Sequence, residues 1–184
     1  MSLLTPVWIE AGPNNAKTTL VFLHGIGGGK KGFQSSVDFF AKQGFRALAW
    51  DMPGYGDSPL DGTLSFESLA ASLEDMLDAA KVEKAVLVGH SMGGNVAMMY
   101  AGARPERIRR LVNLEGFGLP ETRPAQAPGR YARWMDEVKA FHRGEKDLKS
   151  YDSADGVAAR LMKTNRRLAL DKAQWLAHHW ARQD

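Results

Sequence analysis

Strand-length apolar runs recur along the N-terminal part of the chain and restrict the folds it can adopt. The runs are nearly continuous rather than alternating, a pattern typical of strands buried on both faces of a parallel sheet. They are TTLVFLHG (Thr18–Gly25), FRALAWD (Phe45–Asp51), AVLVGHS (Ala85–Ser91) and IRRLVNLEG (Ile108–Gly116). VWIEAG (Val7–Gly12) is a candidate edge strand.

Helical patterns lie between these runs. Ser65 is a candidate N-cap for a helix with one apolar stripe, formed by Phe66, Leu69, Ala70, Leu73, Met76, Leu77 and Ala80. Phe33–Gln43 is a second candidate helix, closed by Gly44, and Gly94–Ala103 is a third. Because strands and helices alternate, the sequence predicts an α/β fold, a mostly parallel sheet with helices on both faces.

The composition changes after Gly118. LPETRPAQAPGR (Leu119–Arg130) is rich in proline and is predicted to be a linker. The segments that follow have helical patterns and no strand pattern: Tyr131–Arg143, Ser153–Thr164 and Asp171–Arg182. We therefore divide the chain into a core, residues 1–120, and a helical cap, residues 121–184.

Bulk composition excludes several classes of protein. The formal net charge is only +3, and the local basic cluster has no interleaved aromatic residues, so we expect no nucleic-acid partner. That cluster comprises Arg104, Arg107, Arg109 and Arg110. The chain has no cysteine, no signal-peptide pattern and no apolar segment of about 20 residues, so we expect a cytoplasmic protein that does not enter a membrane. We expect no metal or organic cofactor.

The segment Gly89-His90-Ser91-Met92-Gly93 fits the pattern G-x-S-x-G, after an apolar run and before a helical pattern. A strand that turns sharply into a helix holds its turn residue in a strained conformation, which exposes the side chain above the sheet. Such a turn leaves no room for bulky neighbours. Ser91 is therefore a candidate nucleophile, and the N–H of Met92 is a candidate donor to an oxyanion.

The glycine-rich segment His24-Gly25-Ile26-Gly27-Gly28-Gly29 ends the first apolar run. Glycines allow a backbone to approach a substrate closely, so the N–H of Ile26 is a candidate second oxyanion donor. The segment does not fit the phosphate-binding pattern G-x-x-x-x-G-K-[ST]. With Gly29-Lys30 as its G-K pair, the pattern requires glycine at position 24 and serine or threonine at position 31, where this chain has His24 and Lys31.

Three motifs together, HG-x-GGG, AWDMPGYGDSP (Ala49–Pro59) and GHSMGG, resemble the α/β-hydrolase superfamily in order and spacing. LEGFGLP, followed by a helical segment with RRLALDKAQWLAHHW, resembles the serine-hydrolase-like branch that is often called Kraken-like. The resemblance implies a Ser-His-acid triad, a two-donor oxyanion hole and a helical cap between the sixth and seventh core strands. Ser91 matches the nucleophile, and Ile26 and Met92 match the oxyanion positions.

The histidines do not match the family pattern. The family base lies on a loop after the last core strand, and no strand pattern follows Gly118. We predict a structural role for His24, with bonds to backbone, and a His90 side chain directed away from the nucleophile's face. The others, His142, His178 and His179, lie in the cap segment. We therefore expect the catalytic histidine and two further core strands to lie outside these 184 residues.

Glu115 is a candidate for the acid of the triad. A minority of the superfamily places the acid after the sixth strand, and LVNLEG ends such a strand. The alternative, equally weighted, is a glutamate that faces solvent or pairs with Arg110. Asp51 and Asp57 are better explained as turn-forming residues.

The sequence thus favours a serine hydrolase that cleaves an ester, amide or related acyl bond of a small molecule through an acyl-Ser91 intermediate. The alternative is a non-catalytic binding module or inactive fragment with the same fold. Because the strand Ile108–Leu114 would form an apolar sheet edge, we expect a partner chain or a further C-terminal segment to cover it. We also expect this chain to be inactive by itself.

Overall fold

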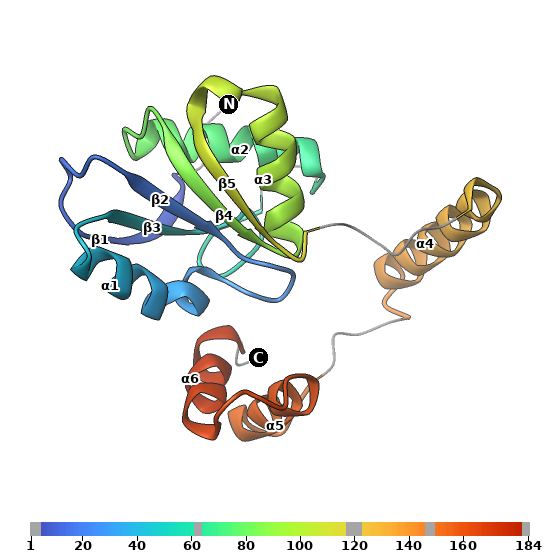
Figure 1. Cartoon of the computed structure of the whole chain (residues 1–184). Helices are drawn as coiled ribbons and strands as arrows, with labels where there is room; N and C mark the ends of the chain where they lie inside the picture. Colours follow the sequence, from blue (N-terminus) through green and yellow to red (C-terminus); the bar gives the residue numbers. More distant parts are fainter. Residues whose placement is uncertain (1–4, 61–63, 117–122, 146–149, 182–184) are drawn as a thin grey trace. The chain divides into compact units, whose positions relative to one another are not determined.

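The structure, a computed structural model, describes residues 5–60, 64–116, 123–145 and 150–181 (Figure 1). Two compact units divide the chain. One comprises Met1–Gly118 with His178–Asp184, and the other comprises Leu119–Ala177. The division into a core, residues 1–120, and a helical cap, residues 121–184, stays a prediction.

The first unit is built on a five-stranded sheet with the strand order β1-β3-β2-β4-β5. The strands are β1 (Val7–Ala11), β2 (Thr19–Leu23), β3 (Arg46–Asp51), β4 (Ala85–His90) and β5 (Ile108–Leu114). β3, β2, β4 and β5 pair in parallel, whereas β1 pairs antiparallel with β3. The prediction of a mostly parallel sheet is confirmed, and Val7–Ala11 does form an edge strand.

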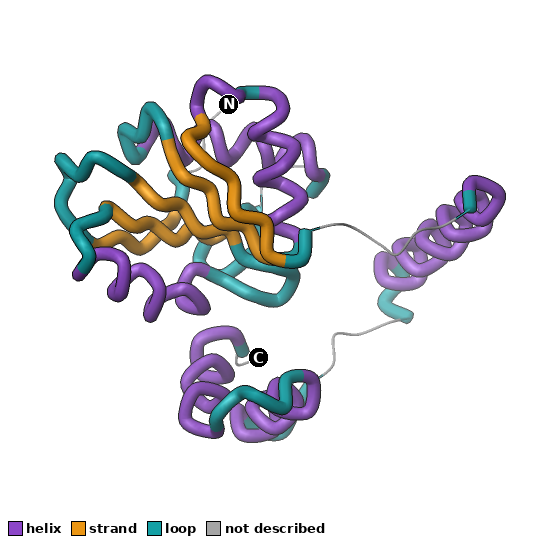
Figure 2. The backbone as a smooth tube through the Cα atoms, viewed as in Figure 1, coloured by secondary structure: helices purple, strands orange, loops and turns teal. Residues whose placement is uncertain are grey.

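Three α-helices accompany the sheet (Figure 2): α1 (Gln34–Lys42), α2 (Phe66–Ala79) and α3 (Met92–Ala103). Successive side chains of β2 belong to two different clusters of buried apolar residues. Val21 and Leu23 belong to the cluster that contains the buried residues of α2 and α3, whereas Leu20 and Phe22 pack with Val37 of α1. Because side chains alternate across a strand, these clusters lie on opposite faces of the sheet. The predicted α/β fold with helices on both faces is therefore confirmed.

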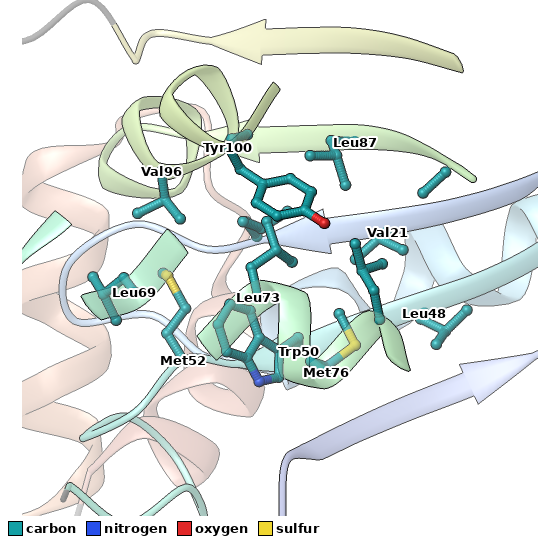
Figure 3. Packing of buried hydrophobic residues seen from close by; sticks show 14 of the residues in the cluster. Val21, Leu48, Trp50, Met52, Leu69, Leu73, Met76, Leu87, Val96 and Tyr100 are labelled. Atoms are coloured by element: carbon teal, nitrogen blue, oxygen red, sulfur yellow. The ribbon is translucent and has the colours of Figure 1, made fainter. Parts of the chain in front are cut away.

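The larger cluster forms the main core (Figure 3). Trp50 of β3, Leu73 of α2 and Val96 of α3 are almost completely buried in it. Each such side chain contributes about 1.5–3 kcal/mol when it leaves water. The core thus fixes β3, β4, α2 and α3 against one another and holds rigid the strand ends from which the candidate site is built.

Local signals in the sequence set the start of α2. The hydroxyl of Ser65 accepts a hydrogen bond from the N–H of Ser68, and the Ser68 hydroxyl accepts one from the N–H of Ser65. This reciprocal capping box satisfies two N–H groups that a helix start leaves unpaired. The predicted N-cap at Ser65 is confirmed.

Short 3-10 helices lie at Lys30–Phe33 (η1) and Pro105–Arg107 (η2) in the first unit. The edge strand β5 leaves Val112 and Leu114 40% and 42% exposed. The covering of this edge by a partner or another segment stays a prediction.

The second unit contains the 3-10 helix η3 (Pro124–Gln126), α4 (Ala127–His142) and α5 (Ala154–Thr164), and α6 (Leu170–Trp180) begins in it. Ala158 of α5 packs against Ala173 and Ala177 of α6 in a small apolar cluster. The prediction of a linker up to Arg130 is wrong, because α4 already begins at Ala127. Pro128 lies in the first turn of α4, where a helix does not need the N–H that proline lacks.

Candidate active site

Ser91 occupies a one-residue turn between β4, which ends at His90, and α3, which begins at Met92. Its backbone has φ 52° and ψ −118°. A non-glycine residue held with positive φ costs about 1–3 kcal/mol, and such residues cluster at functional sites. Ser91 is the N-cap of α3, yet its side chain makes no capping hydrogen bond. The half-buried hydroxyl is therefore not engaged in capping the helix.

Glycines pack tightly around this turn. A Cβ atom at Gly93 would lie 2.6 Å from the carbonyl oxygen of His24, and one at Gly89 would lie 2.6 Å from the Cα atom of Gly94. Neither backbone atom can move aside without disturbing the sheet or the helix. The expectation that the turn has no room for larger neighbours is confirmed.

The turn is also joined to β5. The N–H of Ser91 donates a hydrogen bond of 2.8 Å to the carbonyl oxygen of Leu114, the last residue of β5. β4 and β5 are parallel, so their carboxyl ends meet at the same edge of the sheet. Ser91 therefore lies at the edge where ligands bind in open α/β sheets.

The two candidate oxyanion residues approach Ser91 from different elements. Met92 is buried at the first position of α3, where backbone N–H groups have no partner within the helix. Ile26 lies in a turn that the Gly28 N–H closes by bonding to the carbonyl oxygen of Gly25 at 3.0 Å. A Cβ atom at Gly25 would lie 3.0 Å from the Cβ of Ser91, so this turn passes directly beside the serine.

His24 is buried and bonded to backbone on both sides. Its Nδ1 lies 2.9 Å from the carbonyl oxygen of Gly25, and its Nε2 accepts a hydrogen bond of 3.1 Å from the N–H of Met52. This pairing requires the neutral ring with its proton on Nδ1. Burial lowers the pKa of His24 and outweighs the opposing effects of the Gly25 hydrogen bond and the charge of Asp51. The predicted structural role is confirmed.

The other histidines with described side chains lie in β4 and α6. The ring of His90 lies beside Gly25, because a Cβ at Gly25 would be 3.1 Å from its Nδ1. The predicted direction of this ring relative to the Ser91 hydroxyl stays a prediction. His178 and His179 are exposed residues of α6, and the side chain of His142 lies outside the described part of the chain.

Glu115, the candidate acid, directly follows Leu114, whose carbonyl oxygen accepts the hydrogen bond from the Ser91 N–H. It is exposed and has φ 61°, so it too is a non-glycine residue with a left-handed backbone. Asn113 stabilises this turn, since its Oδ1 accepts a hydrogen bond of 2.7 Å from the N–H of Gly116. Among the described residues, no ion pair joins Glu115 to Arg110. The structure thus brings Glu115 to the same sheet edge as Ser91.

The sequence did not predict a buried ion pair between Lys30 and Asp51. The Nζ atom of Lys30 lies 2.5 Å from Oδ2 of Asp51 and also pairs with the exposed carboxylate of Asp57. Burial lowers the pKa of Lys30, but the hydrogen bonds to Asp51 and Asp57 outweigh it, and the net pKa is raised. Asp51 is more than a turn-forming residue, because it is 1% exposed and joins two loops. A lysine at the end of a glycine-rich loop is the only sequence signal for this pair.

Two kinds of feature are absent from the part of the chain that the structure describes. It contains no group of three or more His, Cys, Asp or Glu side chains arranged to hold a metal ion. It also contains no helix that is both long and apolar enough to cross a membrane.

The family described as the alpha/beta hydrolase fold matches residues 18–169. This chain belongs to that family. The superfamily resemblance drawn from the three motifs is confirmed, whereas membership of the serine-hydrolase-like branch stays a prediction.

Curated relatives of this α/β-hydrolase chain are hydrolases. It is 44% identical over 105 residues to 2-hydroxy-6-oxononadienedioate/2-hydroxy-6-oxononatrienedioate hydrolase of Paraburkholderia phymatum. This match covers 54% of this chain and 36% of the relative. It is also 40% identical over 121 residues to the sn-1-specific diacylglycerol lipase ABHD11 of Mus musculus. This match covers 65% of this chain and 39% of the relative. The chain thus spans well under half the length of these relatives.

Solved structures agree on the fold. The thioesterase domain from the curacin biosynthetic pathway has a TM-score of 0.79 at 20% identity, covering 98% of this chain and 66% of that one. The hypothetical protein PA1622 of Pseudomonas aeruginosa also has a TM-score of 0.79, at 23% identity, covering 97% of this chain and 63% of that one.

Proposed function

We propose that this α/β hydrolase cleaves acyl bonds with Ser91 as its nucleophile. The observation that carries the proposal is the backbone of Ser91, with φ 52° and ψ −118°, held between β4 and α3. This strain is sustained by close glycine packing on both sides of the serine. A folded protein tolerates such strain where the surrounding structure over-determines it, and a reactive hydroxyl gives a functional reason for it.

The chemistry follows from the groups around the serine. The Ser91 oxygen attacks the carbonyl carbon of the substrate while an imidazole removes the hydroxyl proton. The carbonyl oxygen becomes an oxyanion, for which the N–H groups of Ile26 and Met92 are the proposed donors. The imidazole then gives its proton to the leaving group. The leaving group departs, and the acyl group remains bound to Ser91 as an ester. A water molecule hydrolyses this ester by the same steps.

Glu115 is the proposed acid, which would orient the imidazole and stabilise its cation. Its support is its place, one residue after Leu114, whose carbonyl oxygen accepts the N–H of Ser91. We assign the base to none of the described histidines. Both ring nitrogens of His24 are in backbone contacts, the side chain of His90 is predicted to point away from the nucleophile, and His178 and His179 are exposed. The base is proposed to come from a further segment, as the sequence predicts.

The proposed substrate is a small molecule with an ester, amide or related acyl bond. The relatives support this class only broadly, since one is named a diacylglycerol lipase and another an oxononadienedioate hydrolase. No nucleic acid, membrane or cofactor is proposed to take part.

The test is hydrolysis of p-nitrophenyl butyrate by the complete protein, which includes the segment proposed to carry the base, and by its Ser91→Ala and Ser36→Ala variants. Ser36 is a half-buried serine of α1 and serves as the matched control. We expect Ser91→Ala to lose the activity and Ser36→Ala to keep it. Activity that persists in a folded Ser91→Ala variant would contradict the proposal, and a complete lack of activity would favour a binding module with this fold.

A further inference from the structure

The glycine-rich loop from His24 to Lys30 is fixed at both ends to the carboxyl end of β3, through Asp51 and Met52. At its start, Nε2 of His24 accepts the N–H of Met52 at 3.1 Å. At its end, the N–H of Lys30 donates to Oδ1 of Asp51 at 2.6 Å, and its Nζ donates to Oδ2 of the same carboxylate at 2.5 Å. Ile26 lies between these two attachments.

The carboxylate of Asp51 also binds a second loop, residues 52–58, which follows β3. The N–H of Asp57 donates to Oδ2 of Asp51 at 2.9 Å. Asp51 therefore accepts hydrogen bonds from two backbone N–H groups, one in each loop, and from the Lys30 ammonium group. With these donors, the hydrogen-bonding capacity of this carboxylate, which is 1% exposed, is satisfied.

Packing leaves this carboxylate little freedom to move. A Cβ atom at Gly29 would lie 3.0 Å from Oδ1 of Asp51, and one at Gly56 would lie 2.6 Å from the same oxygen. Both loops therefore touch Asp51 through glycines, and a shift of the carboxylate would move the backbone on either side.

The same loop passes directly beside the nucleophile. A Cβ at Gly25 would lie 3.0 Å from the Cβ of Ser91. Tyr55 of the second loop reaches the same region, with its ring 5.1 Å from that of His24 and its hydroxyl 3.7 Å from the sulfur of Met92. The position of the Ile26 N–H relative to Ser91 thus depends on how firmly the two loops are joined.

We propose that Lys30 and Asp51 are positioning residues that hold the His24–Lys30 loop where its backbone can bind the oxyanion formed at Ser91. This inference rests on the proposed function, because it assigns a task to that site. Neither side chain touches the substrate in this account. Their effect passes through the backbone of the loop, since a displacement of about 1 Å in a catalytic group can cost about 100-fold in rate.

The central variant, made in the complete protein that includes the segment proposed to carry the base, is Lys30→Met. Methionine keeps a side chain of similar length and removes the charge. Lys31→Met is the matched control, because Lys31 is the neighbouring lysine in η1. Lys30→Arg restores a cation that can still reach Asp51. We expect Lys30→Met to lower kcat for a p-nitrophenyl ester about 10- to 100-fold with little change in KM, Lys31→Met to change neither, and Lys30→Arg to recover most of the rate.

Two comparisons separate positioning from a general structural effect. First, rates are expressed per serine titrated with a fluorophosphonate, so that unfolded protein does not count. Second, the ester is compared with its thionoester, whose C=S group is a poor partner for an oxyanion hole. We expect Lys30→Met to lower the ratio of ester to thionoester rates about tenfold or more, because only the ester loses oxyanion binding.

Hydrogen exchange tests the same inference without any turnover. In Lys30→Met, the amides of Gly28 and residue 30 are expected to exchange at least about tenfold faster, whereas Val21 in β2 should not change. Unchanged exchange in this loop would overturn the inference, and so would an unchanged ester-to-thionoester ratio. Turnover that survives in Ser91→Ala would instead refute the proposed function.

Discussion

The backbone N–H of Ser91 binds the carbonyl oxygen of Leu114 at 2.8 Å, which joins the turn after β4 to the last residue of β5. Two non-glycine residues with left-handed backbones, Ser91 at φ 52° and Glu115 at φ 61°, lie on either side of this bond. The proposed nucleophile and the proposed acid are thus held by one backbone link at the carboxyl edge of the sheet.

Glu115→Gln should lower kcat by about two to four orders of magnitude with little change in KM, because an amide cannot stabilise the imidazolium that forms in the transition state. Glu106→Gln, at an exposed glutamate of η2, is the control and should leave both constants unchanged. Steady-state kinetics on an aryl ester measures both. A near-normal kcat for Glu115→Gln would place the acid elsewhere.

Gly93→Ala should destabilise the protein by about 1–3 kcal/mol or more, because its Cβ would lie 2.6 Å from the carbonyl oxygen of His24. Gly102 lies in the same helix and has open space around it. Gly102→Ala should therefore raise stability by about 0.5–1 kcal/mol through its higher helix propensity. Urea denaturation of both variants measures the two effects, and equal shifts would refute the packing argument.

Ser65→Ala should lower the free energy of unfolding by about 1 kcal/mol, because the N–H of Ser68 loses its acceptor at the start of α2. Ser65→Asp supplies another acceptor and should keep most of the stability. Thermal unfolding followed by circular dichroism compares the two variants. If both lose the same amount, the cap does not explain the effect.

Stability should fall as the pH drops below about 6.5, in part because of His24. Burial lowers the pKa of His24 from its ordinary value of 6.5 in the folded protein. The unfolded chain therefore binds more protons between 6.5 and the lower folded value, so this contribution is complete above pH 6.5 and is lost on acidification. Urea midpoints measured from about pH 5 to 8 should decline less steeply in His24→Gln. Parallel curves for the two proteins would contradict this role of His24.

The sequence predicted the strands and first helices well because local patterns specify them. Four continuous apolar runs became the parallel strands, and Ser65 caps α2 as expected. α3 begins two residues before the predicted Gly94, because the turn at Ser91 occupies a single residue. The antiparallel direction of β1 was not predicted, since an edge strand has the same composition in either direction.

The contacts at the candidate site that the sequence did not predict join residues that are far apart in the chain. Lys30 and Asp51 are 21 residues apart, and neither one alone indicates that they meet below the surface. The Asp57 N–H does bond to Asp51, as in a turn, but the buried ion pair depends on how β2 and β3 align. The bond from Ser91 to Leu114 likewise depends on the register between β4 and β5.

The most direct test of the account is to locate the residue that a fluorophosphonate modifies. The complete protein, with the segment proposed to supply the base, is treated with the probe. Its intact mass is measured by mass spectrometry, and the modified residue is located by peptide sequencing. The account predicts one covalent adduct, on Ser91, that is absent from Ser91→Ala and present in Ser36→Ala. An adduct on another residue, or an undiminished adduct in folded Ser91→Ala, would contradict the assignment of Ser91 as the nucleophile.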